Sequence, residues 1–248
     1  MPIYDPEHVE YGITTGHIQI VMEGGRSLPA YWAHPVSGWR LPAVALIHDW
    51  WGVTPIIRRM ANLFAQTGYY VIVPDLFDGQ IASTPGEAME RVKALGDGGY
   101  ARVDAALTVL ETHHNTNGDV AAIGVGLGGS LAFEAAVTRP DLEAAVAYGG
   151  FPQRCLGRFG QARTPILAFY GAGEPYIPPA IVDRLRAELA SSSLAHEVVI
   201  LAGAGHEFFA EGALEPQRLA GRQALARTFA FLEAHLRPPA RLEHRKVY

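Results

Sequence analysis

The feature that most constrains this chain is the stretch over residues 121–130, which reads Ala-Ala-Ile-Gly-Val-Gly-Leu-Gly-Gly-Ser. The apolar residues at its start are typical of a buried strand, and Leu131, Phe133 and Val137 follow it at helical spacing. Glycines between a strand and a helix indicate a tight turn. The stretch therefore predicts a strand, a turn and a helix in direct succession.

The glycine spacing of this turn has three interpretations. It matches the G-x-nucleophile-x-G elbow of α/β-hydrolases, with Gly126 at the nucleophile position, where there is no side chain to attack. It also satisfies G-x-G-x-x-G, but a dinucleotide-binding site also requires an acidic residue about 20 residues further on, at the end of the next strand. Asp141 and Glu143 precede the next apolar run, at residues 144–148. In the third interpretation the glycines serve packing alone.

Apolar runs of strand length alternate with helical patterns over most of the chain. Residues 17–22 and 31–33 flank Gly24-Gly25 and predict an antiparallel hairpin at the sheet edge. Further strands are expected at residues 42–47, 69–73, 120–123, 144–148, 165–170 and 197–201. Helices are expected at residues 55–66, 85–112 with a break at Gly98-Gly99, 178–190 and 216–236. The alternation predicts an α/β fold with a mostly parallel, doubly wound sheet and helices on both faces.

Length and composition favour a single compact domain over residues 1–248, with the edge hairpin within residues 1–40 and a polar tail at residues 238–248. The tail is interpreted either as a loose end or as a strap on a neighbour. Hydrophobic residues make up 49% of the chain and charged residues 18%, which is typical of globular proteins. The net charge of −5 provides no basic surface for nucleic acid or for a membrane.

The chain is predicted to be cytoplasmic and to act on a small molecule. Residues 1–9 lack the basic head and apolar core of a signal peptide, and no uncharged apolar run is long enough to span a bilayer. Cys155 is the only cysteine, so no internal disulfide can form. The sequence does not decide the oligomeric state.

Chemically notable residues follow four of the predicted strands, where α/β sheets carry their sites. These segments are residues 48–52 (His-Asp-Trp-Trp-Gly), Gly126-Leu127, residues 171–174 (Gly-Ala-Gly-Glu) and residues 203–206 (Gly-Ala-Gly-His). Glu174 and then His206 follow the elbow in the order nucleophile, acid, base, which is the order of α/β-hydrolases.

Together with residues 73–77 (Val-Pro-Asp-Leu-Phe), these segments resemble the dienelactone hydrolase family of α/β-hydrolases. The matching pieces span roughly residues 40–210, nearly the whole predicted core. The resemblance implies the α/β-hydrolase fold, hydrolysis of an ester or lactone, and no cofactor. We expect no metal either, because His113 and His114 are adjacent rather than on one helical face, and His48-Asp49 has no third ligand at a suitable spacing.

The departures from that family are informative. The elbow residue is usually cysteine or serine and here is Gly126; the acid is usually aspartate and here is Glu174; the loop acid is usually glutamate and here is Asp49. Relatives that open charged dienelactones also carry two substrate-binding arginines, whose positions correspond here to Gly79 and Ala210. The resemblance therefore argues against a small dicarboxylate-type substrate.

The remaining residues predict acid–base chemistry on a bound carbonyl compound. His206, oriented by Glu174, is the expected base, and Asp49 and Gly126 complete the catalytic set. The backbone N–H groups of Trp50 and Leu127 are the expected oxyanion hole. Aromatic residues beside the strand ends predict an apolar substrate and are expected to contact it; they are Trp51, Phe77, Phe151, Tyr176 and Phe208.

Two classes of function remain open. The first is an enzyme without a covalent nucleophile, which uses His206 for water-mediated hydrolysis or for an isomerase, lyase or cyclase reaction. The alternative is a non-catalytic ligand-binding pseudo-hydrolase. Retention of both Glu174 and His206 favours the enzyme, because a binding protein does not require that pair. Cys155 as a relocated nucleophile and Ser130, one helical turn past the elbow, are the less favoured candidates.

Overall fold

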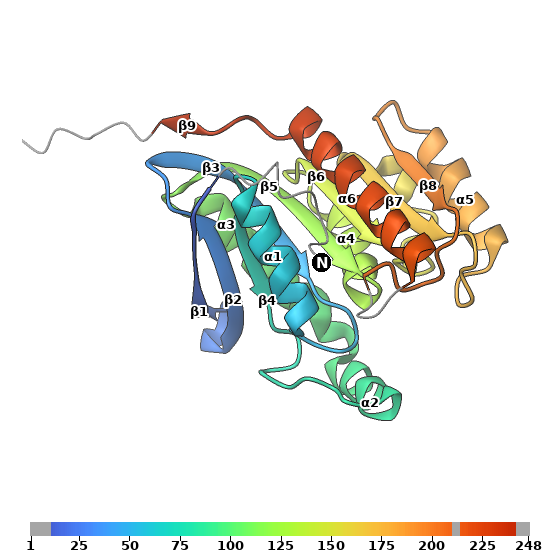
Figure 1. Cartoon of the computed structure of the whole chain (residues 1–248), viewed down its shortest axis with the longest axis horizontal. Helices are drawn as coiled ribbons and strands as arrows, with labels where there is room; N and C mark the ends of the chain where they lie inside the picture. The colour runs from blue at the N-terminus through green and yellow to red at the C-terminus, as the bar shows by residue number, and fades with distance from the viewer. Residues whose placement is uncertain (1–10, 210–213, 242–248) are drawn as a thin grey trace, which may run out of the picture.

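A computed structural model describes residues 11–209 and 214–241 of the chain. The described residues form a nine-stranded sheet in the order β1-β2-β4-β3-β5-β6-β7-β8, with β9 paired to β3 (Figure 1). Neighbouring strands from β4 to β8 in this order are parallel, whereas β1, β2 and β9 pair in the antiparallel sense. The predicted fold class, a mostly parallel α/β sheet with an N-terminal antiparallel hairpin, is confirmed.

The hairpin and the strands lie close to their predicted positions. The hairpin comprises β1 (Ile13–Val21) and β2 (Ser27–Pro35) and ends before residue 40, because Trp39 already opens β3. The other strands are β3 (Trp39–Ile47), β4 (Tyr70–Pro74), β5 (Thr116–Val125), β6 (Ala144–Tyr148), β7 (Ile166–Gly171), β8 (Glu197–Leu201) and β9 (Ala240–Arg241). The tail begins as a strap on its own chain, since Ala240 and Arg241 pair with Arg40 and Trp39. Residues 1–10 and 242–248, which include the rest of the predicted tail, lie outside the described residues.

Helices cover both faces of the sheet. One face carries α1 (Pro55–Gln66) and α6 (Glu215–His235), which lie in front of the sheet in Figure 1. The other face carries α3 (Gly99–Thr112), α4 (Leu127–Thr138) and α5 (Pro179–Ala190). The predicted break near residue 98 separates α3 from α2 (Pro85–Leu95), with a short 3₁₀ turn between them. No helix in the described ranges has the length and apolar character needed to cross a membrane.

The central strand β3 shows why these residues form a doubly covered sheet. Alternate residues point to opposite faces of a strand, so Ala43, Ala45 and Ile47 join the core under α3 and α4. Val44 and Leu46 join the core under α1. All five side chains are fully buried, which is the environment expected for a continuous apolar run in a parallel sheet. The carboxyl ends of β3, β5, β7 and β8 lie at one edge of this sheet and carry the candidate site.

Candidate active site

The turn between β5 and α4 is a strained elbow centred on Gly126. Gly126 precedes the first residue of α4 and has φ +52° and ψ −110°, a conformation that L side chains rarely adopt. Its N–H donates to the Tyr148 carbonyl oxygen at 2.8 Å, which anchors the turn to the neighbouring strand β6. The sequence prediction of a strand, a tight turn and a helix is therefore confirmed.

The glycines around this elbow differ in whether the surrounding structure leaves room for a side chain. A Cβ on Gly124 would lie 2.1 Å from the Gly128 backbone, and one on Gly128 would lie 2.2 Å from the Ile47 carbonyl oxygen. These two positions admit no side chain, because strand, helix and β3 pack backbone to backbone. A Cβ on Gly126 would meet nothing closer than 3.7 Å, at Asp49 Cβ and His206 Nε2. Residue 126 thus has room for a side chain directly in front of an imidazole nitrogen.

His206 and Glu174 come from two loops that are bonded to each other. The loop after β7 and the loop after β8 are joined by the Gly173 N–H, which donates to the Ala204 carbonyl oxygen at 2.9 Å. Gly171 permits this approach, since a Cβ there would lie 2.2 Å from the Gly205 carbonyl oxygen. The loops bring His206 Nδ1 to 2.7 Å from Glu174 Oε2.

This acid–histidine pair is shielded and oriented. The side chains of Glu174 and His206 are 6% and 17% exposed, so water competes little for their hydrogen bond. The other carboxylate oxygen of Glu174 accepts the Tyr176 N–H at 2.8 Å. With Nδ1 donating its proton to Glu174, Nε2 is left with a lone pair that faces Gly126. The hydrogen bond to Glu174 therefore favours the tautomer with its proton on Nδ1.

Two aromatic rings flank His206, and a glycine makes space for it. The ring centroid of Phe151 lies 5.5 Å from that of His206, and the ring of Tyr176 meets it edge to face at 5.1 Å. Gly149, at the end of β6, has φ +61°, and a Cβ there would lie 3.1 Å from His206 Cε1. The position of the imidazole thus depends on a missing side chain at residue 149.

Asp49 is a second titratable group beside the elbow. Its Oδ1 accepts the Trp51 N–H at 2.9 Å, and Oδ2 has no hydrogen-bond partner in the described part of the chain. Burial raises the pKa of Asp49 to about 6, opposed by the Trp51 N–H and by His206, while Glu207 adds to the rise. Asp49 therefore changes charge near neutral pH. The influence of Glu207 was not predicted from the sequence, although this acid directly follows His206.

Two backbone donors near the elbow are free. The N–H groups of Trp50 and Leu127 donate to no acceptor among the residues that the structure describes. Leu127 is the first residue of α4, where unsatisfied N–H groups and the helix dipole favour negative charge. These are the two groups that the sequence predicted as an oxyanion hole.

His48, in the loop after β3, is structural. Its side chain is fully buried, with Nε2 accepting the Leu76 N–H at 3.0 Å and Nδ1 donating to the Asp49 carbonyl oxygen at 2.6 Å. Burial lowers the pKa of His48, so the ring stays neutral. Asp75 closes the next loop by accepting the N–H groups of Phe77 and Gly79. His48 therefore ties the loop that carries Asp49 and Trp50 to the loop that Asp75 closes.

The predicted aromatic contacts divide into two groups. Phe151 and Tyr176 contact His206, and Trp51 packs against Trp50 at 5.1 Å. Phe208 lies elsewhere: it is 2% exposed and packs in the core with Tyr148 and Phe209. The ring of Phe77 contacts His48 and lines a different pocket. Sequence proximity to a strand end did not distinguish these two residues from those that point at the site.

The less favoured nucleophiles are both engaged or buried. Cys155 is 2% exposed, and burial raises the pKa of its thiol to about 11. Ser130 Oγ accepts the Phe151 N–H at 2.9 Å and donates to the Gly126 carbonyl oxygen at 3.3 Å. Of the two positions that correspond to substrate-binding arginines, Gly79 closes the loop after β4, and Ala210 lies outside the described residues.

The sheet order, the elbow at Gly126 and the acid–histidine pair define an α/β-hydrolase. The sequence model of the dienelactone hydrolase family matches residues 28–236, and the chain belongs to that family. In the described residues, no group of three or more histidine, cysteine or acidic side chains is arranged to hold a metal.

Relatives and solved structures agree with this family. The carboxymethylenebutenolidase of Rhodococcus opacus is 30% identical over 210 residues, which cover 78% of this chain and 81% of the relative. A protein of a Bradyrhizobium species, named as a probable 2-oxo-3-(5-oxofuran-2-ylidene)propanoate lactonase, is 28% identical and covers 86% of this chain and 91% of its own. The dienelactone hydrolase of Anabaena variabilis shares the fold with a TM-score of 0.67 and 20% identity, over 91% of this chain and 99% of its own.

Proposed function

We propose that this protein is an enzyme that acts on a small, largely apolar carbonyl, ester or lactone substrate without a covalent nucleophile. The observation that carries this proposal is the 3.7 Å between His206 Nε2 and the Cβ position of residue 126. In a hydrolase with a side chain at the elbow, this space holds the attacking atom. Here no side chain fills it, so a water molecule or a substrate atom is proposed to meet the base directly.

The proposed reaction has two variants that use the same groups. In hydrolysis, His206 Nε2 takes a proton from a water above Gly126, and the resulting hydroxide attacks the carbonyl carbon. In the non-hydrolytic variant, His206 takes a proton from the substrate itself, as an isomerase, lyase or cyclase requires. Glu174 stabilises the imidazolium that forms in either case.

The remaining groups have supporting roles. The N–H groups of Trp50 and Leu127, which have no acceptor among the described residues, are suited to bind the oxygen that becomes negatively charged. Removal of one such donor typically costs about a hundredfold in rate. Asp49 Oδ2 is available to orient the water or to protonate a leaving group, because its pKa of about 6 allows both charge states near neutrality. Phe151 and Tyr176 offer apolar walls next to the base.

The names of the relatives support the substrate class. One relative is named as a carboxymethylenebutenolidase and another as a lactonase, so a lactone is the first substrate to test. A non-catalytic ligand-binding role is the second candidate, and the glycine at position 126 is the observation that favours it.

The test compares hydrolysis of activated aryl esters and unsaturated lactones by the native protein and by Gly126→Ala, Gly126→Ser, Gly126→Cys and His206→Ala variants. Water-mediated hydrolysis predicts native activity that is lost in His206→Ala and in Gly126→Ala, where the methyl group displaces the water. Activity only in the Gly126→Ser and Gly126→Cys variants would indicate an intact site whose native reaction is not hydrolysis. Silence of every variant, with ligand-induced thermal stabilisation of the native protein, would favour the binding role.

A further inference from the structure

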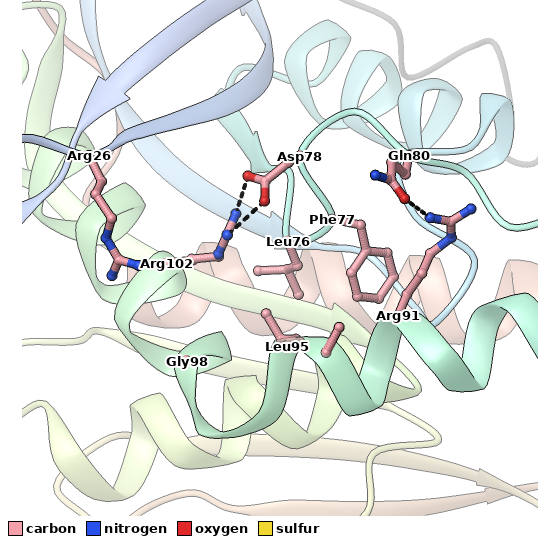
Figure 2. Close-up of a pocket in the computed structure, with 10 residues that line it drawn as sticks. Arg26, Leu76, Phe77, Asp78, Gln80, Arg91, Leu95, Gly98 and Arg102 are labelled. Atoms are coloured by element: carbon pink, nitrogen blue, oxygen red, sulfur yellow. Dashed lines mark hydrogen bonds and ion pairs between the residues drawn. The ribbon is translucent and has the colours of Figure 1, made fainter.

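A pocket of about 240 Å³ lies apart from the elbow. It is enclosed by the β1–β2 turn, the loop after β4, α2 and the start of α3 (Figure 2). None of the residues around Gly126 or His206 lines it; Leu76 and Phe77 connect it to the first site through His48, which accepts the Leu76 N–H and contacts the Phe77 ring. A ligand in this pocket would therefore occupy a space of its own.

The pocket concentrates positive charge in a protein that is acidic overall. Arg26, Arg91 and Arg102 line it together with a single carboxylate, Asp78, whereas the whole chain has a net charge of −5. Asp78 pairs with Arg102 through two hydrogen bonds of 2.6 and 2.9 Å, and the charge of Arg26 also acts on its carboxylate. Two guanidinium charges are left in excess.

In the described part of the protein, neither Arg26 nor Arg91 forms an ion pair or a hydrogen bond with a carboxylate. Arg26 makes no side-chain hydrogen bond or ion pair in the described part of the protein. Arg91 donates to neutral acceptors, the Gln80 side-chain oxygen and the Ile81 carbonyl, and its buried Nε has no acceptor among the described residues. A charged donor that is buried without a partner is costly, and a bound anion would satisfy it.

The space between these charges is apolar. Figure 2 shows Arg26 and Arg102 at one end of the pocket and Arg91 at the other, with Leu76, Phe77 and Leu95 between them. The side chains of Leu76 and Phe77 are 2% and 6% exposed, so they form a fixed floor. Charge at the ends and carbon between them suit an organic anion better than an inorganic one.

We propose that this pocket binds a small organic acid, with its apolar body on Leu76, Phe77 and Leu95 and its carboxylate paired with Arg26 or Arg91. The site is separate from the proposed catalytic centre and does not depend on the reaction assigned to it. Asp78 competes with the ligand carboxylate for Arg102, because its own carboxylate already pairs with that guanidinium.

The proposal is tested by calorimetric titration of the native protein with benzoate, phenyl phosphate and inorganic phosphate. We expect benzoate to bind with a Kd of about 1 mM or below, and inorganic phosphate at least about tenfold more weakly because it cannot use the apolar floor. Tighter binding of phenyl phosphate than of benzoate would overturn the assignment to a carboxylate. Equal binding of benzoate and inorganic phosphate would reduce the pocket to a non-selective charged surface and would also overturn it.

Variants locate the binding. An Arg26→Gln, Arg91→Gln double variant is expected to weaken benzoate binding at least about tenfold, since hydrogen bonds to charged groups are lost. Asp78→Asn is expected to tighten it several-fold by freeing Arg102, a gain that misfolding cannot produce; asparagine tolerates the φ of +53° at this position. His206→Ala is the control and should leave benzoate affinity unchanged. Loss of binding in His206→Ala, or unchanged binding in both pocket variants, would refute the proposal.

Discussion

His206 Nε2 lies 3.7 Å from the point where residue 126 would carry its Cβ, and residue 126 is glycine. The two residues are 80 positions apart in the chain and meet because β5 and β8 end at the same edge of the sheet. The imidazole that we propose as the base is therefore hydrogen-bonded to Glu174 and faces a position that carries no side chain.

The first prediction concerns the 2.7 Å hydrogen bond between Glu174 and His206 Nδ1. Glu174→Gln retains the size of the side chain but removes the charge that stabilises the imidazolium, so kcat should fall at least about a hundredfold with little change in KM. The measurement is steady-state hydrolysis, made in the Gly126→Ser background if the native protein has no esterase activity. An unchanged kcat in Glu174→Gln would show that the pair has no catalytic role.

The second prediction uses two glycines with similar backbone strain. Gly149→Ala would place a methyl group 3.1 Å from the His206 ring, whereas Gly157→Ala would meet no atom within 4 Å; both glycines have positive φ, +61° and +89°. Both variants should lose some stability, but only Gly149→Ala should also lose activity, by about tenfold or more, because it displaces the base. Thermal unfolding and ester hydrolysis of the two proteins make the comparison. If Gly149→Ala and Gly157→Ala lose activity equally, the loss is caused by backbone strain and not by displacement of His206.

The sequence predicted most of the fold because its signals are local. The continuous apolar run of β3 and the helical pattern of α1 depend on neighbouring residues, and both elements lie where they were predicted. The order of Glu174 and His206 after Gly126 predicted the pair, because the topology brings the carboxyl ends of parallel strands together. Gly126, Glu174 and His206 each follow the end of their strand by no more than five residues, so few arrangements of these residues were possible.

The rest of the site depends on side-chain direction, which the sequence does not contain. Phe208 and Phe151 both follow strands, but Phe208 points into the core under α6 while Phe151 faces His206. The arginine pocket was not predicted, since Arg26 and Arg91 are 65 positions apart and are brought together only by the packing of the β1–β2 turn near α2. Gly149 carried no signal either, because the close approach that requires it is made by a residue far along the chain.

The third prediction separates a buried thiol from a reactive one. Cys155 is 2% exposed and its pKa is raised to about 11, so it should react very slowly with a thiol reagent at pH 8 until the protein is unfolded. A cysteine introduced as Gly126→Cys should react rapidly, because it faces His206 and the N-terminus of α4. Thiol titration of the native protein, Gly126→Cys and Cys155→Ser follows both sites. Loss of native activity in Cys155→Ser would instead support the hypothesis that Cys155 is a relocated nucleophile.

The last prediction is the pH dependence that Asp49 gives to stability. Its pKa is about 6 in the folded protein against an ordinary value of 3.8, so the folded state favours the protonated form. That contribution is fully present below about pH 4 and is lost as the pH rises through 6. Asp49→Asn keeps the acceptor for the Trp51 N–H and removes the charge. The variant should therefore gain stability over the native protein at pH 8, by up to about 3 kcal/mol, and gain little at pH 4.

The matched control is Asp141→Asn, whose change in stability at pH 8 is expected to be opposite to that of Asp49→Asn. Hydrogen bonds from Arg139 lower the pKa of Asp141, so its ionisation stabilises the folded protein at pH 8, and Asp141→Asn should lose stability there and little at low pH. Urea unfolding of both variants at pH 4 and pH 8 measures the two differences. If Asp49→Asn is less stable than the native protein at pH 8 but not at pH 4, as expected for Asp141→Asn, then the folded state stabilises Asp49 as an anion. It would then be a permanent negative charge beside His206, and its proposed role as a proton donor would fall.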